Sequence, residues 1–249
     1  MNSQLPKTST AFLGLLRADF TVQWRNRRSA VLIFIVPVLI MYSWKGLAKT
    51  LGNGFVMATC ITVGLIAIGL MGYSNTLAKD RDRGIFQRLR VSPVPSGMFM
   101  ISRLTVQLVM IMILTAMLFV LASTQLHFEL TVEGYVLGLL TALLGGGLYL
   151  GLGQIVAGLL KNAETVNATS RLIYFMFILV GMIGSTGLLG SEVKTAVQWS
   201  PYGTVSSGLA MAMQGGEWTT SGWLALLATL GYGLLFSFLG IKWFRWNVK

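Results

Sequence analysis

Charged side chains are scarce in this sequence. Asp, Glu, Lys and Arg make up 11% of its 249 residues, whereas about a quarter is usual for a soluble globular protein. So few charges cannot solvate the surface of a globular chain of this length. Because 54% of the residues are hydrophobic and the mean hydropathy is +0.71, the composition predicts an integral membrane protein.

Other absences exclude several kinds of chemistry. The sequence has one cysteine, Cys60, and one histidine, His127, so it cannot form an intrachain disulfide, an HExxH site or a Cys/His metal cluster. It also has no GxxxxGK[ST] phosphate-binding loop. We therefore expect no catalytic residue, no metal and no cofactor on this chain, and the energy for any work must come from another chain.

Six charge-poor runs are long enough to cross a bilayer, since about 20 residues at 1.5 Å each span a hydrocarbon core of about 30 Å. Within the third run only Arg103 is charged, and its long side chain can reach the interface. All seven Trp residues lie at or near the ends of the runs or in flanking segments, where such rings are favoured. We predict an all-α integral membrane fold in which residues 1–249 form a single transmembrane domain, with spans at about 29–47, 54–78, 98–123, 134–160, 172–190 and 221–241.

Two further segments complete the predicted fold. Residues 195–216 carry no charge but contain Ser200-Pro201-Tyr202-Gly203 and Ser206-Ser207-Gly208, which break or loosen a helix, so we expect a re-entrant helical pair before the last span. Residues 8–28 are predicted to form an interfacial elbow helix. Its apolar side chains repeat every four residues, at Phe12, Leu16, Phe20 and Trp24.

The basic residues indicate the orientation of the chain. Of the 19 Lys and Arg residues, 16 fall on one side of the six predicted spans, and the exceptions are Lys45, Lys49 and Lys194. By the positive-inside rule this side is cytoplasmic and contains both termini. The net charge of +11 then serves topology and contact with anionic membrane lipid, and we expect no nucleic-acid partner.

The loop at 79–97 stands out, because its segment "KDRDRGIFQRLRVSPVPS" (79–96) has seven charged side chains. Alternating charges precede Gly84, and Ile85, Phe86 and Leu89 follow among further Arg residues. The pattern indicates a short amphipathic element. A solvated loop is the plainer interpretation, but topology requires neither the acids nor the apolar residues, so we favour a docking surface.

The sequence here resembles the permeases of type-2 (exporter) ABC transporters. The resemblance rests on Gly84, Leu89, the Ser92-Pro93-Val94 segment, Arg103 at the start of the third span, and Ser200-Pro201-Tyr202 before the last span. In that family the loop forms a coupling helix seated in a separate ATPase. The implied coupling residues are Asp80, Arg81, Asp82, Arg83, Gly84, Phe86, Gln87, Leu89 and Pro93. Gln87 departs from the family, where the position is commonly acidic, and this puts one salt bridge to the ATPase in doubt.

The resemblance further implies a half-transporter of a bacterial plasma membrane. Its partners would be two copies of an ATP-binding subunit, which hold ATP and Mg, and a second permease copy, either identical or a close paralogue. The substrate path would run at the permease interface between the second and fifth spans. The implied path residues are Met57, Thr59, Thr62, Ser74 and Asn75 on the second, with Tyr174, Phe177 and Met182 on the fifth.

Three classes of function remain open. The first is a permease for ATP-driven export of an amphipathic or lipophilic compound, such as a drug, an antibiotic, an antimicrobial peptide or a lipid. The second is a permease for a lipid-linked glycan or a cation. The third is a non-transporting membrane scaffold or sensor.

Within the fourth span, Gly147 and Gly151 have the small-xxx-small spacing of a close helix contact.

Overall fold

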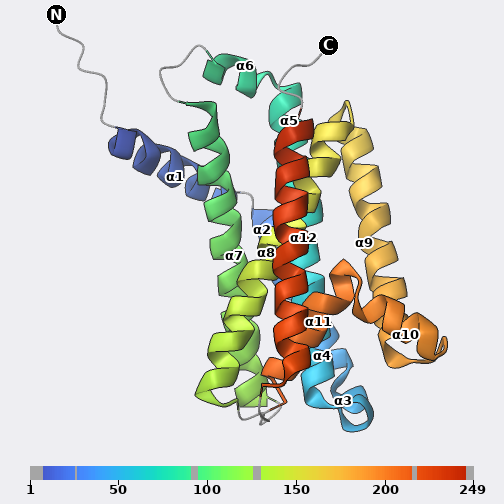
Figure 1. Ribbon diagram of the computed structural model, residues 1–249. Helices are drawn as coiled ribbons and strands as arrows, with labels where there is room; N and C mark the ends of the chain where they lie inside the picture. Colours follow the sequence, from blue (N-terminus) through green and yellow to red (C-terminus); the bar gives the residue numbers. More distant parts are fainter. Residues whose placement is uncertain (1–7, 26, 91–94, 126–129, 215–217, 245–249) are drawn as a thin grey trace, which may run out of the picture.

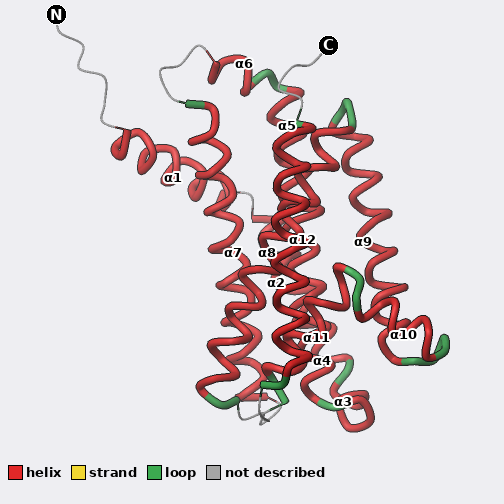
Figure 2. The backbone as a smooth tube through the Cα atoms, in the orientation of Figure 1, coloured by secondary structure: helices red, strands yellow, loops and turns green. Residues whose placement is uncertain are grey.

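The apolar runs fold as helices, because in lipid a helix satisfies its own backbone N–H and C=O groups. The computed structural model describes residues 8–25, 27–90, 95–125, 130–214 and 218–244, and every regular element in these ranges is helical (Figures 1 and 2). In chain order they are α1 (Thr8–Arg25), α2 (Arg27–Ser43), α3 (Lys45–Leu51), α4 (Asn53–Ile66), the π-helix η1 (Ala67–Tyr73), α5 (Ser74–Asp82), α6 (Ile85–Arg90), α7 (Ser96–Gln125), α8 (Val132–Leu159), α9 (Ala163–Thr186), α10 (Ser191–Gln198), α11 (Pro201–Ala212) and α12 (Thr220–Trp243).

The predicted all-α membrane fold is confirmed. Five helical stretches are long and apolar enough to cross a membrane: Asn53–Asp82, Gly97–Gln125, Val132–Leu159, Ala163–Thr186 and Thr220–Trp243. A sixth is formed by Ile33–Ser43 together with Lys45–Leu51, which meet at a bend of 63°. The first predicted span is therefore a broken helix.

The fifth span differs from its predicted start at residue 172. Helix α9 begins at Ala163, because the side chain of Asn162 accepts a hydrogen bond from the N–H of Thr165 and caps the helix. The first turns of α9 are polar, and a search for apolar runs does not detect a helix of that composition.

The second span lies at the centre of the bundle. In its most apolar window, α4, η1 and α5 are 83% buried, against 17% for α9. Glycine lets α8 pass close to this span: a Cβ on Gly153 would fall against the carbonyl oxygen of Gly69. Gly151 lies against the backbone of α12 at Ser237, but Gly147 faces open space. The predicted contact through both Gly147 and Gly151 is therefore wrong for Gly147.

Short helices occupy the predicted re-entrant segment. Helix α11 begins after Ser200, whose hydroxyl accepts from the N–H of Gly203 at 3.2 Å. The hydroxyl of Tyr149 donates to the carbonyl of Pro201 at 3.1 Å, and that of Tyr232 donates to the carbonyl of Trp199 at 2.9 Å. The break between α10 and α11 is thus held by side chains of α8 and α12.

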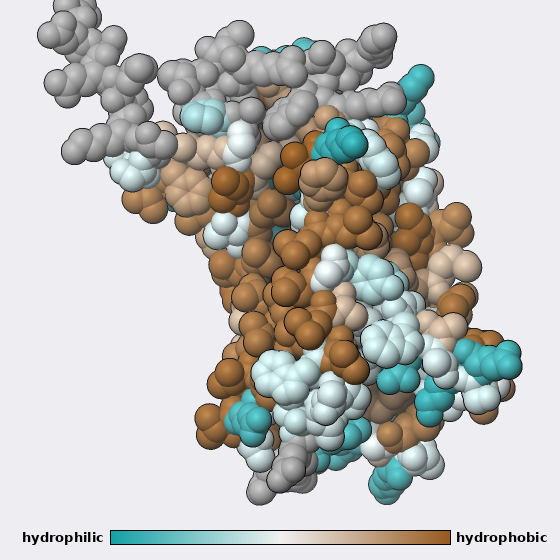
Figure 3. All heavy atoms as spheres, in the orientation of Figure 1, coloured by the Kyte–Doolittle hydropathy of each residue, from teal (hydrophilic) through white to brown (hydrophobic). Residues whose placement is uncertain are grey.

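The outer surface of the bundle is apolar. Figure 3 shows hydrophobic side chains over much of one face and hydrophilic ones gathered toward its ends. Helices α3 and α10, which carry Lys45, Lys49 and Lys194, lie at one end, and α6 lies at the other (Figure 1). The three basic residues predicted to be extracytoplasmic therefore lie at the end opposite α6.

Candidate functional site

The charged stretch at 79–83 belongs mostly to a helix, whereas the sequence predicted a loop from residue 79. Helix α5 continues to Asp82, and the N–H of Gly84 then bonds to the carbonyl of Arg81 at 2.9 Å. Gly84 has a φ of 69°, a left-handed conformation that suits glycine. The chain can therefore turn away from α5 at this point and begin α6.

Asp80 points from α5 toward α7. Its carboxylate forms an ion pair with the guanidinium of Arg103. The Nε of Arg103 also lies 3.5 Å from a carboxylate oxygen of Asp19 on α1, and Ser102 donates to the other oxygen of Asp19 at 2.6 Å. We call Asp19, Asp80 and Arg103 the ion triad. Because all three side chains are 10–12% exposed, the triad is a mostly buried link between α1, α5 and α7.

This location corrects the expected role of Arg103. Its side chain was predicted to reach the membrane interface, but it instead lies between two carboxylates and over the ring of Phe99, with 4.7 Å from the guanidinium carbon to the ring centroid. Two unpaired carboxylates in this position would be costly, and their presence explains why a membrane span contains an arginine here.

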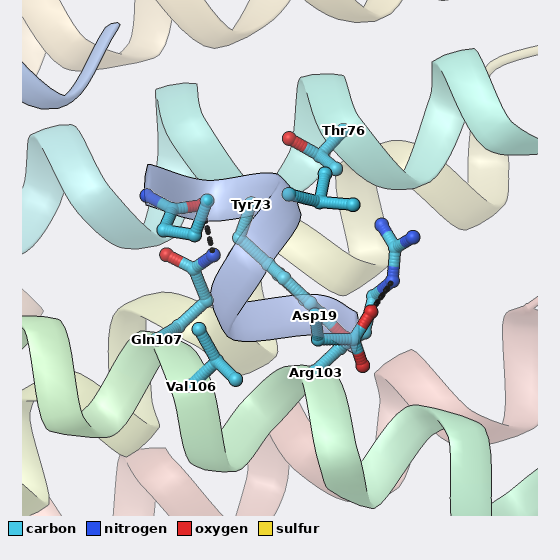
Figure 4. A pocket seen from close by; sticks show the side chains of 8 residues that line it. Asp19, Tyr73, Thr76, Arg103, Val106 and Gln107 are labelled. Carbon is cyan, nitrogen blue, oxygen red and sulfur yellow. Dashed lines mark hydrogen bonds and ion pairs between the residues drawn. The ribbon is translucent and has the colours of Figure 1, made fainter. Parts of the chain in front are cut away.

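A small pocket lies beside the ion triad. Tyr73, Thr76, Asp19, Arg103 and Gln107 surround it, and Gln107 also donates to the side-chain oxygen of Gln23 on α1 at 3.3 Å (Figure 4). The cavity volume is about 20 Å³, which is room for about one water molecule. The pocket is therefore too small to hold a transported compound.

Arg81 points from a different side of α5, toward the end of α8. Its guanidinium donates to the carbonyls of Ala157 at 2.5 Å, Leu160 at 2.7 Å and Lys161 at 3.0 Å. The last carbonyls of a helix have no partner within the helix. Since Arg81 is only 3% exposed, it is an internal cap for α8.

Asp82 binds the start of α9. Its carboxylate accepts from the backbone N–H of Ala163 at 2.8 Å, and its other oxygen lies 3.9 Å from the Nε of Arg81. A carboxylate at a helix N-terminus is stabilised by the free N–H groups and the helix dipole. Arg81 and Asp82 together attach α5 to the turn between α8 and α9.

Phe86 turns into the protein from α6. It is 1% exposed, and its ring meets those of Phe99 and Phe244 edge-on, with centroids 5.7 and 5.6 Å away. Phe99 belongs to α7, and Phe244 directly follows α12. The ring thus attaches α6 to two spans and is not available to a partner in this conformation.

The predicted coupling residues therefore divide into two groups. Asp80, Arg81 and Phe86 are buried within the chain, whereas Asp82, Arg83 and Gln87 are exposed. Gly84 supplies the turn between α5 and α6. The side chain of Leu89 and all of Pro93 lie outside the described residues, so their predicted contact with an ATPase stays a prediction.

The predicted path residues of the second span are mostly packed inside the chain. Met57, Thr59, Thr62 and Ser74 have no exposed surface. Thr59 and Thr62 donate to the carbonyls of Phe55 and Ala58 in their own helix. In this conformation these four residues do not line a surface path.

Ser74 and Asn75 instead support the π-helix. Ser74, Asn75 and Thr76 each donate to the backbone carbonyl four residues earlier, at Leu70, Met71 and Gly72. A π-helix interrupts the regular α-helical ladder, and three successive polar side chains bond to its carbonyls. Ser74 and Asn75 also reach α9, through Ser170 at 2.9 Å and Asn167 at 3.3 Å.

Helix α9 exposes an apolar stripe next to its predicted path residues. Tyr174, Phe177 and Met182 are half-buried, and the ring of Phe177 packs against that of Tyr149 with centroids 6.2 Å apart. The exposed neighbours recur every three to four residues, at Leu172, Phe175, Met176, Leu179 and Val180. The stripe can face lipid or another apolar helix, and the spacing of three and four along α9 is the signal for it in the sequence.

Sequence reasoning missed Asp19 and Ser102. The available signal was a lone carboxylate in the predicted elbow helix and a lone arginine in the third span. Groups of three or more His, Cys, Asp or Glu that could hold a metal are absent from the described ranges. The residues described above instead connect two short helices to the bundle: α5 contacts α7, α8 and α9 and is linked through Arg103 to α1, and α6 contacts α7 and the end of α12.

The chain matches the ABC-2 type transporter family over residues 10–213. This stretch covers most of the chain, including the ion triad, α6 and the α8–α9 turn. Among curated proteins, no sequence matches the chain. The chain thus belongs to the ABC-2 type transporter family and is a membrane-spanning permease component.

Proposed function

We propose that this ABC-2 transporter chain is the permease subunit of an ATP-driven exporter, and that α6 is its coupling helix. Two copies would pair in a bacterial plasma membrane, with both termini and α6 in the cytoplasm. Two separate ATP-binding subunits would supply ATP and Mg. The cargo would be an amphipathic or lipophilic compound, such as a drug, an antibiotic, an antimicrobial peptide or a lipid.

The attachment of α5 and α6 to five other parts of the bundle carries this proposal. A force on α6 passes through Phe86 to α7 and to the end of α12. It passes through Asp80 and Arg103 to α7 and α1, and through Arg81 and Asp82 to α8 and α9. Because packed elements move as rigid units, a push on this short helix can tilt the surrounding spans together.

The apolar character of the bundle supports the cargo class. The exposed stripe of α9 offers Phe175 and Met176 beside aliphatic side chains, and such surfaces adapt to varied apolar ligands. If two copies meet along α9, the half-buried Tyr174, Phe177 and Met182 lie at the edge of the shared interface.

Purification of the tagged chain from its own membranes tests the proposal. We expect an ATP-binding protein to co-purify with it, and ATP hydrolysis by the complex to require that protein. Cells that lack the chain should become more sensitive to at least one member of a panel of membrane-active antibiotics and peptides. A chain purified without any ATP-binding subunit, or deletion cells with unchanged sensitivity to the whole panel, would contradict the proposal.

A further inference from the structure

The fold binds both carboxylates of the α5–α6 segment within the chain. The stretch from Lys79 to Arg83 alternates basic and acidic residues, so its sequence has only a small net charge. In the structure, the Asp80 carboxylate pairs inward with Arg103, and the Asp82 carboxylate is bound to the start of α9. Lys79 and Arg83 remain exposed.

Helix α6 adds a further exposed basic residue. Gln87 and Arg88 are exposed, while Phe86, the aromatic residue of the helix, is turned inward. Across the α8–α9 turn, Lys161 is exposed as well. We call Lys79, Arg83, Gln87, Arg88 and Lys161 the basic face.

The exposed carboxylates near the basic face lie at the start of α9. Among the described residues at this end they are Asp82 and Glu164. Both lie at the first turn of α9, where the helix N-terminus stabilises negative charge. The basic face therefore keeps an excess of positive charge, with Lys79, Arg83, Arg88 and Lys161 against these two exposed carboxylates.

We infer that the ATP-binding subunit receives α6 and the preceding Arg83 in a groove lined by carboxylates, which pair with Arg83 and Arg88, the basic residues before and after Gln87 in the sequence. The inference rests on the proposed function, since it describes the partner of the same coupling helix. The exposed side chains that the structure describes on α6 are Gln87 and Arg88. Complementary charge at such a surface directs the contact and suppresses wrong partners. The groove binds α6 as a cationic helix.

A substitution at Gln87 tests the sign of the charge in the groove. A carboxylate at this position would face the carboxylates of the groove, whereas a groove with a basic residue opposite position 87 would attract it. The isosteric change Gln87→Glu therefore has opposite effects under the two arrangements. Gln198→Glu, an exposed position on α10 at the other end of the bundle, is the matched control.

The test titrates the ATP-binding subunit that co-purifies with the wild-type chain against the full-length permease in nanodiscs of neutral lipid, at about 0.05 M and about 0.3 M salt. We expect Arg83→Glu with Arg88→Glu to raise the Kd at least about tenfold at low salt and to weaken its salt dependence. Gln87→Glu should raise the Kd by about threefold, and Gln198→Glu should leave it unchanged.

Each contrary result has a distinct meaning. Tighter binding by Gln87→Glu, or an unchanged Kd for the double Arg variant, overturns the acidic groove while the proposed function stands. If the double Arg variant has an effect only in nanodiscs with anionic lipid, the basic face binds lipid, which also overturns the inference. If no ATP-binding subunit accompanies the wild-type chain, both the inference and the proposed function fail.

Discussion

The guanidinium of Arg81 donates a hydrogen bond at 2.5 Å to the backbone carbonyl of Ala157, a residue of α8 that lies 76 positions later in the sequence. The same guanidinium also donates to the carbonyls of Leu160 and Lys161, which directly follow α8. A charged side chain beside the proposed docking helix is thus occupied in holding two spans together. Arg81, which would pass a force on to α8, therefore lies close in the sequence to α6, which would receive that force from an ATP-binding subunit.

Removal of Arg103 should strongly destabilise the chain. Arg103→Gln leaves the carboxylates of Asp19 and Asp80 mostly buried without their shared cation, and breaking such a buried ion pair costs about 3–5 kcal/mol. Unfolding of the purified chain in detergent measures the loss. Arg171→Gln, at an exposed position of α9, should have little effect.

A second substitution should partly restore the Arg103 variant. In Arg103→Gln with Asp80→Asn, one of the two unpaired carboxylates is gone, so the combined loss should be smaller than the sum of the single losses. A double-mutant cycle measures this coupling. Additive losses would show that Asp80 and Arg103 do not interact.

Phe86→Ala should detach α6 from the bundle even when no partner is present. The change removes a ring packed between Phe99 and Phe244, and an aromatic-to-alanine change in a core costs about 3–5 kcal/mol. Hydrogen exchange of the isolated permease should accelerate in residues 85–90 and stay unchanged in α8. If exchange in α6 is as fast in the wild-type chain, Phe86 does not anchor the helix.

Two glycines of α8 should respond oppositely to the same substitution. Gly153→Ala places a Cβ against the carbonyl oxygen of Gly69, so α8 and η1 must separate, and we expect a loss of about 1–3 kcal/mol. Gly147→Ala meets nothing within 4 Å and should stabilise the helix by about 0.5–1 kcal/mol. Thermal unfolding of both variants in detergent compares them directly, and equal shifts would contradict the close contact at Gly69.

The sequence predicts the helices well because a lipid environment imposes simple rules on them. Uncharged runs of about 20 residues identify spans, and Ser200-Pro201 marks the break between α10 and α11. The polar first turns of α9 and the bend after Ser43 were missed, because caps and packing set them rather than hydropathy. The pattern of apolar residues does not reveal the π-helix. The three consecutive polar residues Ser74, Asn75 and Thr76 are a signal for it, since their side chains donate to backbone carbonyls of the π-helix.

The sequence predicts the location of the candidate site better than its inner arrangement. The charge cluster at 79–83 marks the segment whose side chains contact α7, α8 and α9. Which charges point inward depends on Arg103, on Asp19 and on the end of α8, all distant in the sequence. Phe86 was expected at a partner surface since an apolar residue in a charged loop suggests one, but Phe99 and Phe244 bury it instead.

The most direct test of the force-transmitting role of α5 and α6 is hydrogen exchange of the complex of permease and ATP-binding subunits, without nucleotide and with ATP trapped. In the wild-type complex, we expect ATP to change exchange in residues 85–90 and in residues 157–170 together. In Arg81→Gln, which loses the full set of hydrogen bonds to the end of α8, the change should be confined to 85–90. If residues 157–170 respond to ATP in Arg81→Gln as they do in the wild-type complex, motion does not pass through Arg81 and the account is wrong.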